Sequence, residues 1–238
     1  MNCFASSSTR SQFAPCTSSP IHRKLVVLGD GATGKTSMLT VRSRGYFPTG
    51  YEPTVFENYV CEVRVEGKLM ELSLWDTAGQ EEFDRLRSLS YADTHIVMAC
   101  FAVNSRVSLE NIESKWIPEV AEHCPNVKIV LVALKCDLRE DEAYLQKTDG
   151  DVITYDEGLE VAKRIRAARY LECSAKHNRG VVEAFDMTAS VALTARPRGG
   201  GSTGLTGDHL HLGGGGGVVE KLKGGGWGKK KNSGCVVM

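Results

Sequence analysis

The sequence lacks the features that mark several large classes of protein. Lysine and arginine balance aspartate and glutamate, 29 against 29, so no excess charge indicates nucleic acid as a partner. The longest apolar run, residues 96–103, is far shorter than the roughly 20 residues of a membrane-spanning helix. The first 20 residues contain no apolar stretch typical of a secretory signal. These absences disfavour a nucleic-acid-binding, an integral membrane or a secreted protein.

The eight cysteines include no Cys-x-x-Cys pair, and no Asn-x-Ser/Thr sequon occurs. Most of the central cysteines lie in apolar, strand-like runs, so we expect reduced core residues of a cytosolic protein rather than a disulfide or zinc framework. Cys3 and Cys16 lie outside these runs. Two alternatives stay open for them, a free thiol and reversible palmitoylation.

Composition divides the 238 residues into three parts. Residues 1–21 are rich in serine and threonine without periodicity, which predicts a disordered arm. Residues 22–196 have the apolar content and periodicity of one folded domain. Residues 197–238 hold more than half of the 25 glycines, which predicts a flexible tether.

The strongest motif is Gly-Asp-Gly-Ala-Thr-Gly-Lys-Thr, which fits the P-loop pattern of a glycine, four free positions and Gly-Lys-Ser/Thr. An apolar run at 24–28 predicts a buried strand before it, and residues 35–44 predict a helix after it. Inward backbone N–H groups and the positive helix end form a site for the α- and β-phosphates. We expect Lys35 to reach the β- and γ-phosphates and the Thr36 hydroxyl to bind Mg²⁺. The loop itself comprises Gly29, Asp30, Gly31, Ala32, Thr33 and Gly34.

Strands and helices alternate after the P-loop, which predicts a mostly parallel sheet with helices on both faces. Glu66-Gly67 predicts a tight turn that joins two antiparallel strands. Further strands are expected at residues 59–65, 68–75, 96–103, 128–134 and 170–173. Helices are expected at 108–122, divided or kinked by Pro118, at 155–168 and at 181–193. Residues 45–54 predict a loop, 82–87 a mobile short helix, and 138–151 an exposed, charged insertion.

Three more motifs follow predicted strands. Asp76-Thr-Ala-Gly79-Gln80 ends the strand at 68–75, Lys135-Cys-Asp137 follows the strand at 128–134, and Ser174-Ala-Lys176 follows the last strand. Ligands of α/β proteins bind at the carboxyl ends of parallel strands. The four motifs are therefore expected at one edge of the sheet.

These motifs, in this order, closely resemble the Ras superfamily of small GTPases over about residues 22–195. The stretches 51–59 and 75–87 and the charged insertion resemble the Rho branch. Residues 133–139, Ala-Leu-Lys-Cys-Asp-Leu-Arg, are similar to the fungal Rho subtype linked to polarised secretion and actin. The resemblance implies the P-loop GTPase fold, with a six-stranded, mostly parallel sheet and one antiparallel edge hairpin.

The resemblance also assigns a guanine site. Asp137 would accept hydrogen bonds from the guanine N1–H and amino group, a donor pair that adenine lacks, so ATP would leave a buried carboxylate unpaired. Lys135 and Phe47 would lie on either side of the base, and the Ala175 N–H would meet the guanine carbonyl. The implied nucleotide site further includes Leu134, Ser174 and Lys176.

At the phosphates, the resemblance implies a Mg²⁺ site formed by Thr36, Thr54 and Asp76, the last acting through water. Thr54 and the Gly79 N–H would also read the γ-phosphate. Gln80 would orient the attacking water, and Lys35 would neutralise developing charge. Tyr51 would close over the phosphates.

Leu134 stands where most of the superfamily has an asparagine that ties the base loop to the P-loop. Leucine cannot form those polar contacts. We hypothesise faster nucleotide release than in relatives with asparagine, with guanine selectivity kept by Asp137.

The implied function is a switch that hydrolyses GTP slowly, because no arginine is expected in the site in cis, and that needs an activating protein. The alternatives are a GTP-locked Rho-like protein, a membrane scaffold with structural nucleotide and an ATP-dependent P-loop enzyme. Gly31, Ala78 and Gln80 argue against the locked protein, and Asp137 and Ala175 against the ATP-dependent enzyme.

The C-terminal Cys235-Val-Val-Met fits a prenylation motif, with methionine favouring farnesyl, and Lys229 to Lys231 would add attraction to an anionic leaflet. This predicts the cytoplasmic face of the plasma or secretory membranes, with a cytosolic pool bound to a dissociation inhibitor. Effectors would read Glu52 to Tyr59. Exchange factors and the inhibitor would use Phe83, Leu86 and Leu89.

Overall fold

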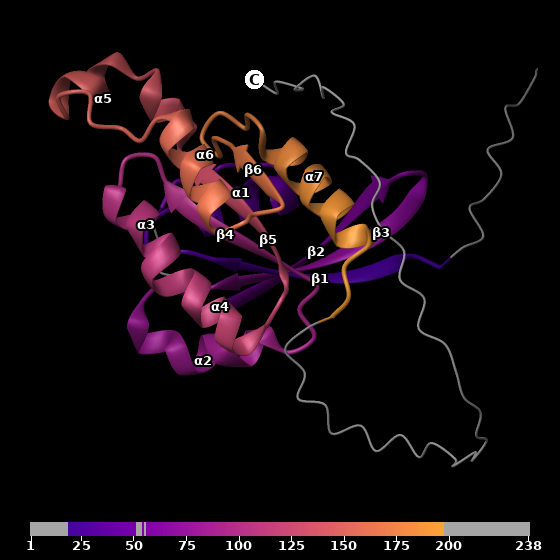
Figure 1. The fold of residues 1–238 in the computed structure, drawn as a ribbon. Coiled ribbons are helices and arrows are strands. Elements are labelled where there is room, and N and C mark those ends of the chain that lie inside the picture. The colour runs from indigo at the N-terminus through magenta and orange to yellow at the C-terminus, as the bar shows by residue number, and fades with distance from the viewer. Residues whose placement is uncertain (1–18, 51–53, 55, 198–238) are drawn as a thin grey trace, which may run out of the picture. The chain divides into compact units, whose positions relative to one another are not determined.

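The computed structural model describes residues 19–50, 54 and 56–197. Its centre is a six-stranded sheet in the order β2-β3-β1-β4-β5-β6 (Figure 1). Only β2 runs antiparallel to its neighbour, which confirms the predicted mostly parallel sheet with one edge hairpin. The strands are β1 Ile21–Leu28, β2 Phe56–Val65, β3 Lys68–Thr77, β4 Ile96–Ala102, β5 Lys128–Leu134 and β6 Arg169–Glu172.

The hairpin between β2 and β3 turns at Glu66 and Gly67, as predicted. Both residues have a positive φ, 50° and 74°, the conformation that two-residue hairpin turns require. The strands are longer than predicted, because backbone pairing continues to Phe56 opposite Thr77. Asp76 therefore lies inside β3 rather than after it.

Helices cover both faces of the sheet (Figure 1). The helices α1 Lys35–Arg44 and α7 Val181–Leu193 contribute to one buried cluster, together with Met98 and Cys100 of β4. The helices α3 Arg106–Asn111, α4 Ile117–His123 and α6 Tyr155–Arg164 contribute to a second, together with Phe101 of β4. β4 is buried along its whole length because successive side chains point into opposite clusters.

The predicted helix at 108–122 is divided, but not at Pro118 itself. A π-helical turn, Ile112–Trp116, joins α3 to α4, and Ile117 N–H donates to Ile112 O. Pro118 consequently lies in the first turn of α4, where its missing N–H costs little. The helix predicted at 155–168 ends early, at Arg164, because Arg166 adopts a left-handed conformation.

The predicted insertion is not exposed throughout. A 3₁₀ turn, Cys136–Arg139, leads into this segment, which contains the short helix α5 Glu142–Lys147. Leu138 is partly buried against the second cluster, which corrects the expectation for the start of this segment. The short helix predicted at 82–87 is α2 Asp84–Ser88, flanked by 3₁₀ turns.

The five cysteines in the described part of the chain are unpaired and buried, as expected for reduced core residues. None of the helices in that part is long and apolar enough to cross a membrane. The predictions for the arm (1–18), for Tyr51 to Pro53 and Val55, and for the tail from 198, including Cys235, lie outside the described residues.

Candidate functional site

The four motifs meet at one edge of the sheet because β1, β3, β5 and β6 are parallel and their carboxyl ends coincide. The P-loop follows β1. Gly79 and Gln80 follow β3, and the loops at 135–137 and 174–176 follow β5 and β6.

The P-loop needs its glycines for close backbone packing. A Cβ on Gly29, whose φ is +139°, would lie 2.1 Å from the Cys100 carbonyl oxygen. Lys35 extends back inside the loop, where its ammonium donates to the carbonyls of Gly29 at 2.7 Å and Asp30 at 2.8 Å. Burial lowers the pKa of Lys35, and the nearby Asp76 opposes that shift. The loop thus holds a buried cation beside its backbone amides.

Three oxygen-bearing side chains converge next to the P-loop. The Thr36 hydroxyl lies 2.5 Å from the Thr54 hydroxyl and donates to Asp76 Oδ2 at 2.6 Å. Asp76 is fully buried, and among the described residues its Oδ1 has no hydrogen-bond partner. Burial raises the pKa of Asp76 to about 6. A buried, half-unpaired carboxylate beside two hydroxyls is a donor set that suits a hard divalent cation such as Mg²⁺.

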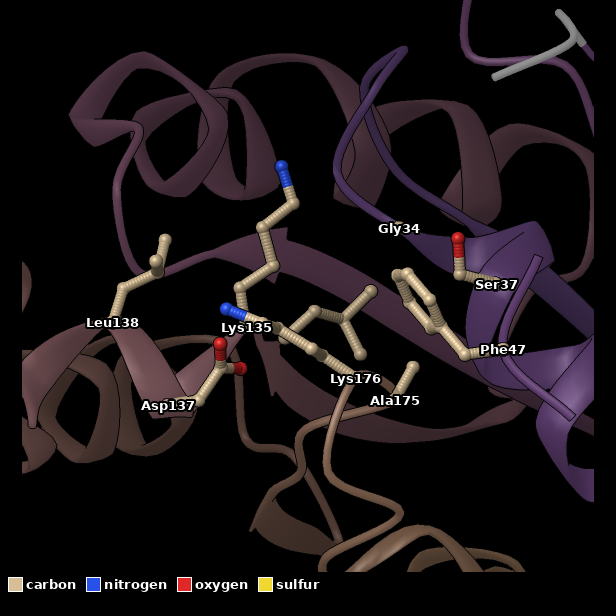
Figure 2. A pocket seen from close by; sticks show the side chains of 9 residues that line it. Gly34, Ser37, Phe47, Lys135, Asp137, Leu138, Ala175 and Lys176 are labelled. Atoms are coloured by element: carbon tan, nitrogen blue, oxygen red, sulfur yellow. The ribbon is translucent and has the colours of Figure 1, made fainter. Parts of the chain in front are cut away.

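A pocket opens between the P-loop and the loops after β5 and β6 (Figure 2). Phe47 lies on one side of it and Asp137 on the other. Lys135, whose φ of 60° turns the chain, donates from Nζ to Ala32 O at 2.8 Å and so joins the base loop to the P-loop. The lining comprises Gly34, Ser37, Phe47, Leu134, Lys135, Asp137, Leu138, Ala175 and Lys176.

The pocket has the character expected for a base. Asp137 is 5% exposed, so a ligand without two donors would leave its carboxylate poorly paired. Phe47 is 44% exposed and is therefore not a packed core residue. Leu134 contributes an apolar wall, and Ser174 turns inward to accept from the His177 N–H at 3.2 Å. Sequence reasoning missed Ser37, which follows the P-loop motif, and Leu138, which lies in the stretch 133–139 but was given no role.

The segment that carries Gln80 packs directly on the P-loop. A Cβ on Gly79 would lie 2.3 Å from the Gly31 nitrogen, and a Cβ on Gly31 would lie 3.8 Å from the Gln80 side chain. No side chain on Gly31 separates Gln80 from the loop. This arrangement places the Gln80 side chain against the P-loop backbone.

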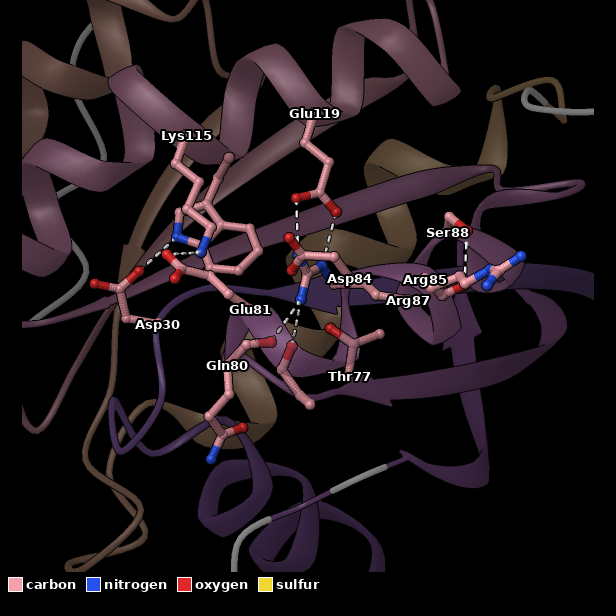
Figure 3. Close-up of polar contacts among 12 residues, drawn as sticks. Asp30, Thr77, Gln80, Glu81, Asp84, Arg85, Arg87, Ser88, Lys115 and Glu119 are labelled. Atoms are coloured by element: carbon pink, nitrogen blue, oxygen red, sulfur yellow. Dashed lines mark hydrogen bonds and ion pairs between the residues drawn. The ribbon is translucent and has the colours of Figure 1, made fainter.

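Arg87 holds the segment that contains Gly79 and Gln80 through hydrogen bonds to its backbone. The sequence did not indicate this role. The predicted charged, mobile helix implied exposure, yet the Arg87 side chain is fully buried. It donates to both carboxylate oxygens of Glu119, at 2.7 and 3.0 Å, and to Ala78 O at 2.9 Å (Figure 3). Tyr91 donates to the same carboxylate at 2.6 Å.

Asp30 faces the π-helical turn rather than the phosphate site. Its two carboxylate oxygens accept from Trp116 Nε1 and Asn111 Nδ2, each at 2.7 Å. Its expected part in nucleotide binding is thereby limited to its backbone. Lys115 in the same turn pairs with Glu81 at 3.1 Å (Figure 3).

A phosphate loop with a buried lysine, a hydroxyl–carboxylate cluster and a pocket ending in a buried aspartate together define a P-loop GTPase. The Ras family model matches residues 24–194. GTP-binding protein rho3 of Schizosaccharomyces pombe is 65% identical over 76% of this chain and 87% of its own length. GTP-binding protein RHO3 of Eremothecium gossypii is 60% identical over 76% of this chain and 88% of its own length. GTP-binding protein RHO3 of Saccharomyces cerevisiae is 54% identical over 77% of this chain and 90% of its own length.

The chain belongs to the Ras family, and within it to the Rho small GTPases of fungi. The resemblance inferred from its motifs is confirmed. It is a GTP-binding switch protein that hydrolyses GTP, and membership of the family implies regulators and effectors in general.

Proposed function

We propose that this GTPase cycles with Mg²⁺ and that its site residues act as their geometry suggests. The observation that carries the proposal is the convergence of Thr36, Thr54 and Asp76, with an unpaired oxygen on the buried aspartate. These residues would hold the ion, Asp76 through water. An ion held there would supply positive charge that neutralises the charge of the nucleotide's phosphates.

In hydrolysis, Gln80 orients the attacking water while Lys35 and the loop amides stabilise charge on the transferring phosphoryl group. Arg87 is committed to Glu119 and Ala78 and is therefore not available to the phosphates. Intrinsic turnover is accordingly slow. An arginine supplied by an activating protein would accelerate it by about 10³–10⁵-fold.

In recognition of the base, Asp137 accepts hydrogen bonds from the guanine N1–H and amino group, and the Ala175 N–H donates to the guanine carbonyl. Lys135 and Phe47 lie on either side of the ring. Thr54 and Gly79 bind the γ-phosphate and are released after hydrolysis, which changes the surface around them. Tyr51 and Lys176 complete the contacts with the nucleotide.

Single-turnover hydrolysis of bound GTP tests the role of Gln80. Gln80→Leu should retain GTP but lower the hydrolysis rate by at least about 100-fold, since the water loses its orienting group. Gln146→Leu, the same change on the exposed surface of α5, should leave the rate unaltered. Hydrolysis that persists in Gln80→Leu would refute the assignment.

We further propose that residues 22–196 form the switch domain and that 1–21 and 197–238 serve as arm and tether. Prenylated Cys235 and Lys229 to Lys231 anchor the protein at the cytoplasmic face of the plasma or secretory membranes, where it acts in polarity, actin organisation and exocytosis. Cys235→Ser should move the protein from the membrane pellet to the supernatant, whereas Cys16→Ser should not. A Cys235→Ser protein that stays in the pellet would contradict anchoring by this cysteine.

Partners are proposed for two surfaces. Effectors read Glu52 to Tyr59, and exchange factors and the dissociation inhibitor use Phe83 to Leu89. Leu86 and Leu89 are 49% and 71% exposed, so together they offer apolar surface that a partner would cover. Leu89→Glu should abolish extraction from membranes by the inhibitor without changing GTP hydrolysis.

A further inference from the structure

The two loops that form the base pocket are joined by an arginine–glutamate pair that no sequence motif contains. Arg139 donates from Nη1 to Glu172 Oε2 at 2.6 Å and from Nη2 to Oε1 at 3.0 Å. The two side chains are only 20% and 19% exposed. Such bidentate, charge-assisted pairs fix orientation as well as distance.

The pair connects the parts of the chain that carry the base-reading atoms. Arg139 ends the 3₁₀ turn Cys136–Arg139, which contains Asp137. Glu172 ends β6, three residues before Ala175. The Cys136 N–H also donates to Cys173 O at 3.3 Å, so backbone and side-chain contacts join the same two loops.

Both partners are themselves held in place. Arg139 Nε donates to Ile153 O at 2.6 Å, and the Tyr170 hydroxyl donates to Glu172 Oε1 at 2.6 Å. The two guanidinium nitrogens of Arg139 that face Glu172 each donate to one of its carboxylate oxygens. The pair is therefore a preformed unit that is held by hydrogen bonds within the chain.

A second arginine–glutamate pair joins the same two parts of the chain, but here the arginine follows β6 and the glutamate follows β5. Arg179, which closes the 174–179 loop by backbone bonds to Ser174, reaches Glu140 at 2.8 Å. The side chains of Arg179 and Glu140 are 42% and 66% exposed, so solvent weakens the interaction between them. Of the two, the pair of Arg139 and Glu172 is the stronger connection.

The side chain of Leu134 adds no polar contact between these loops, because it has no polar atom and packs in an apolar cluster. Within the described residues, the alignment of Asp137 with Ala175 thus depends on contacts such as the one between Arg139 and Glu172. Asp137 can discriminate between bases only if its carboxylate is held in plane with the two donors it reads.

We propose that Arg139 and Glu172 are positioning residues for base specificity. They hold the Asp137 carboxylate and the Ala175 N–H in a fixed position relative to each other. The inference rests on the proposed role of Asp137 in reading guanine. It predicts that loosening the pair weakens binding of guanine more than binding of hypoxanthine. Hypoxanthine keeps the N1–H and the carbonyl but lacks the 2-amino group, so it has one hydrogen bond fewer to lose.

The experiment measures dissociation of fluorescent GDP and IDP from the full chain. Arg139→Met should accelerate release of GDP by about tenfold and of IDP by a smaller factor, so that the ratio of the two rates narrows. Arg139→Lys keeps the charge but not the fork and should fall between Arg139→Met and wild type. Arg179→Met, at the exposed crossing, should change both rates less than twofold.

Arg164→Met is the matched control, because Arg164 makes a similar bidentate pair with Glu113 at 2.8 and 2.7 Å, between α6 and the π-helical turn. It should leave both rates and their ratio unchanged. If Arg139→Met does not fold, Glu172→Gln and Arg139→Lys carry the test, because both retain most of the packing.

Equal acceleration for GDP and IDP, or a lower melting temperature with unchanged rates, would overturn the proposal and leave the pair a structural contact. Failure of the underlying function has a different signature. In that case the wild-type protein would already fail to prefer GDP over IDP and ADP.

Discussion

Gly79 lies against Gly31 so closely that a Cβ on Gly79 would fall 2.3 Å from the Gly31 backbone nitrogen. The segment that precedes Gln80 and the P-loop are therefore in contact through backbone alone. A side chain at Gly79 can be accepted only if the two segments separate.

Gly79→Ala is expected to disturb the GTP-bound form selectively. Separating the segments costs about 1–3 kcal/mol in packing and moves the Gly79 N–H away from the γ-phosphate. We expect the preference for GTP over GDP to narrow and single-turnover hydrolysis to fall by about 100-fold. Gly50→Ala is the control, because a Cβ at Gly50 would meet no atom of the described residues within 4 Å. Unchanged hydrolysis in Gly79→Ala would contradict this account.

Arg87→Met should destabilise the protein and slow hydrolysis together. The change leaves the largely buried Glu119 without its bidentate partner, a loss of about 3 kcal/mol, and frees the Gln80 segment. Urea unfolding measures the first effect. We expect hydrolysis to fall by about tenfold, and exposed Arg85→Met to change neither quantity. Lost stability with normal hydrolysis would show that Arg87 does not position Gln80.

Leu134→Asn tests the hypothesis that leucine accelerates release of nucleotide. Leu134 lines the pocket, and its Cδ1 lies 3.9 Å from a Cβ built on Gly34, so an amide there faces the P-loop. We expect GDP dissociation to slow by about three- to tenfold. Leu134→Ala, which adds no amide, should not slow it. An unchanged rate in Leu134→Asn would refute the hypothesis.

Glu157 should contribute stability that is lost in acid. Hydrogen bonds from Arg106 and from the Thr154 backbone and hydroxyl lower the pKa of Glu157 to about 2, from an ordinary value of 4.5. A lowered pKa stabilises the fold above the unfolded value, and the contribution disappears as pH falls from about 4.5 towards 2.

Glu157→Gln should therefore reduce the free energy of unfolding by about 1 kcal/mol at pH 7, a modest value because the side chain is 39% exposed. In urea titrations, the difference from wild type should begin to shrink below about pH 4.5, persist in part at pH 3 and nearly vanish at about pH 2. Glu160→Gln on the same helix, where the nearest arginine nitrogen is 4.0 Å away, should show no such trend. A difference that does not vary with pH would exclude the charge as its cause.

The sequence by itself determined the parts of the site that depend on local backbone chemistry. A P-loop needs glycines, a lysine and a hydroxyl at fixed spacing between a strand and a helix, so Gly29 to Thr36 could be assigned directly. α1, β5 and α7 begin and end where predicted, because long periodic or apolar runs leave little choice. The role expected for Asp137 came from the family resemblance, and the structure places this residue, buried, in the pocket after β5.

The tertiary structure alone decided which distant side chains support that site. Arg87 meets Glu119 32 residues away, and Arg139 meets Glu172 33 residues away, so no spacing rule relates them. Exposed and buried arginines look alike in a charged run, and Arg87 is buried where it contacts Glu119 and Trp116, which lie far along the chain. The π-helical turn before Pro118 was likewise not predicted from the sequence. Local chemistry therefore fixed which residues are candidates for binding the nucleotide, and long-range packing fixed which side chains hold those residues in place.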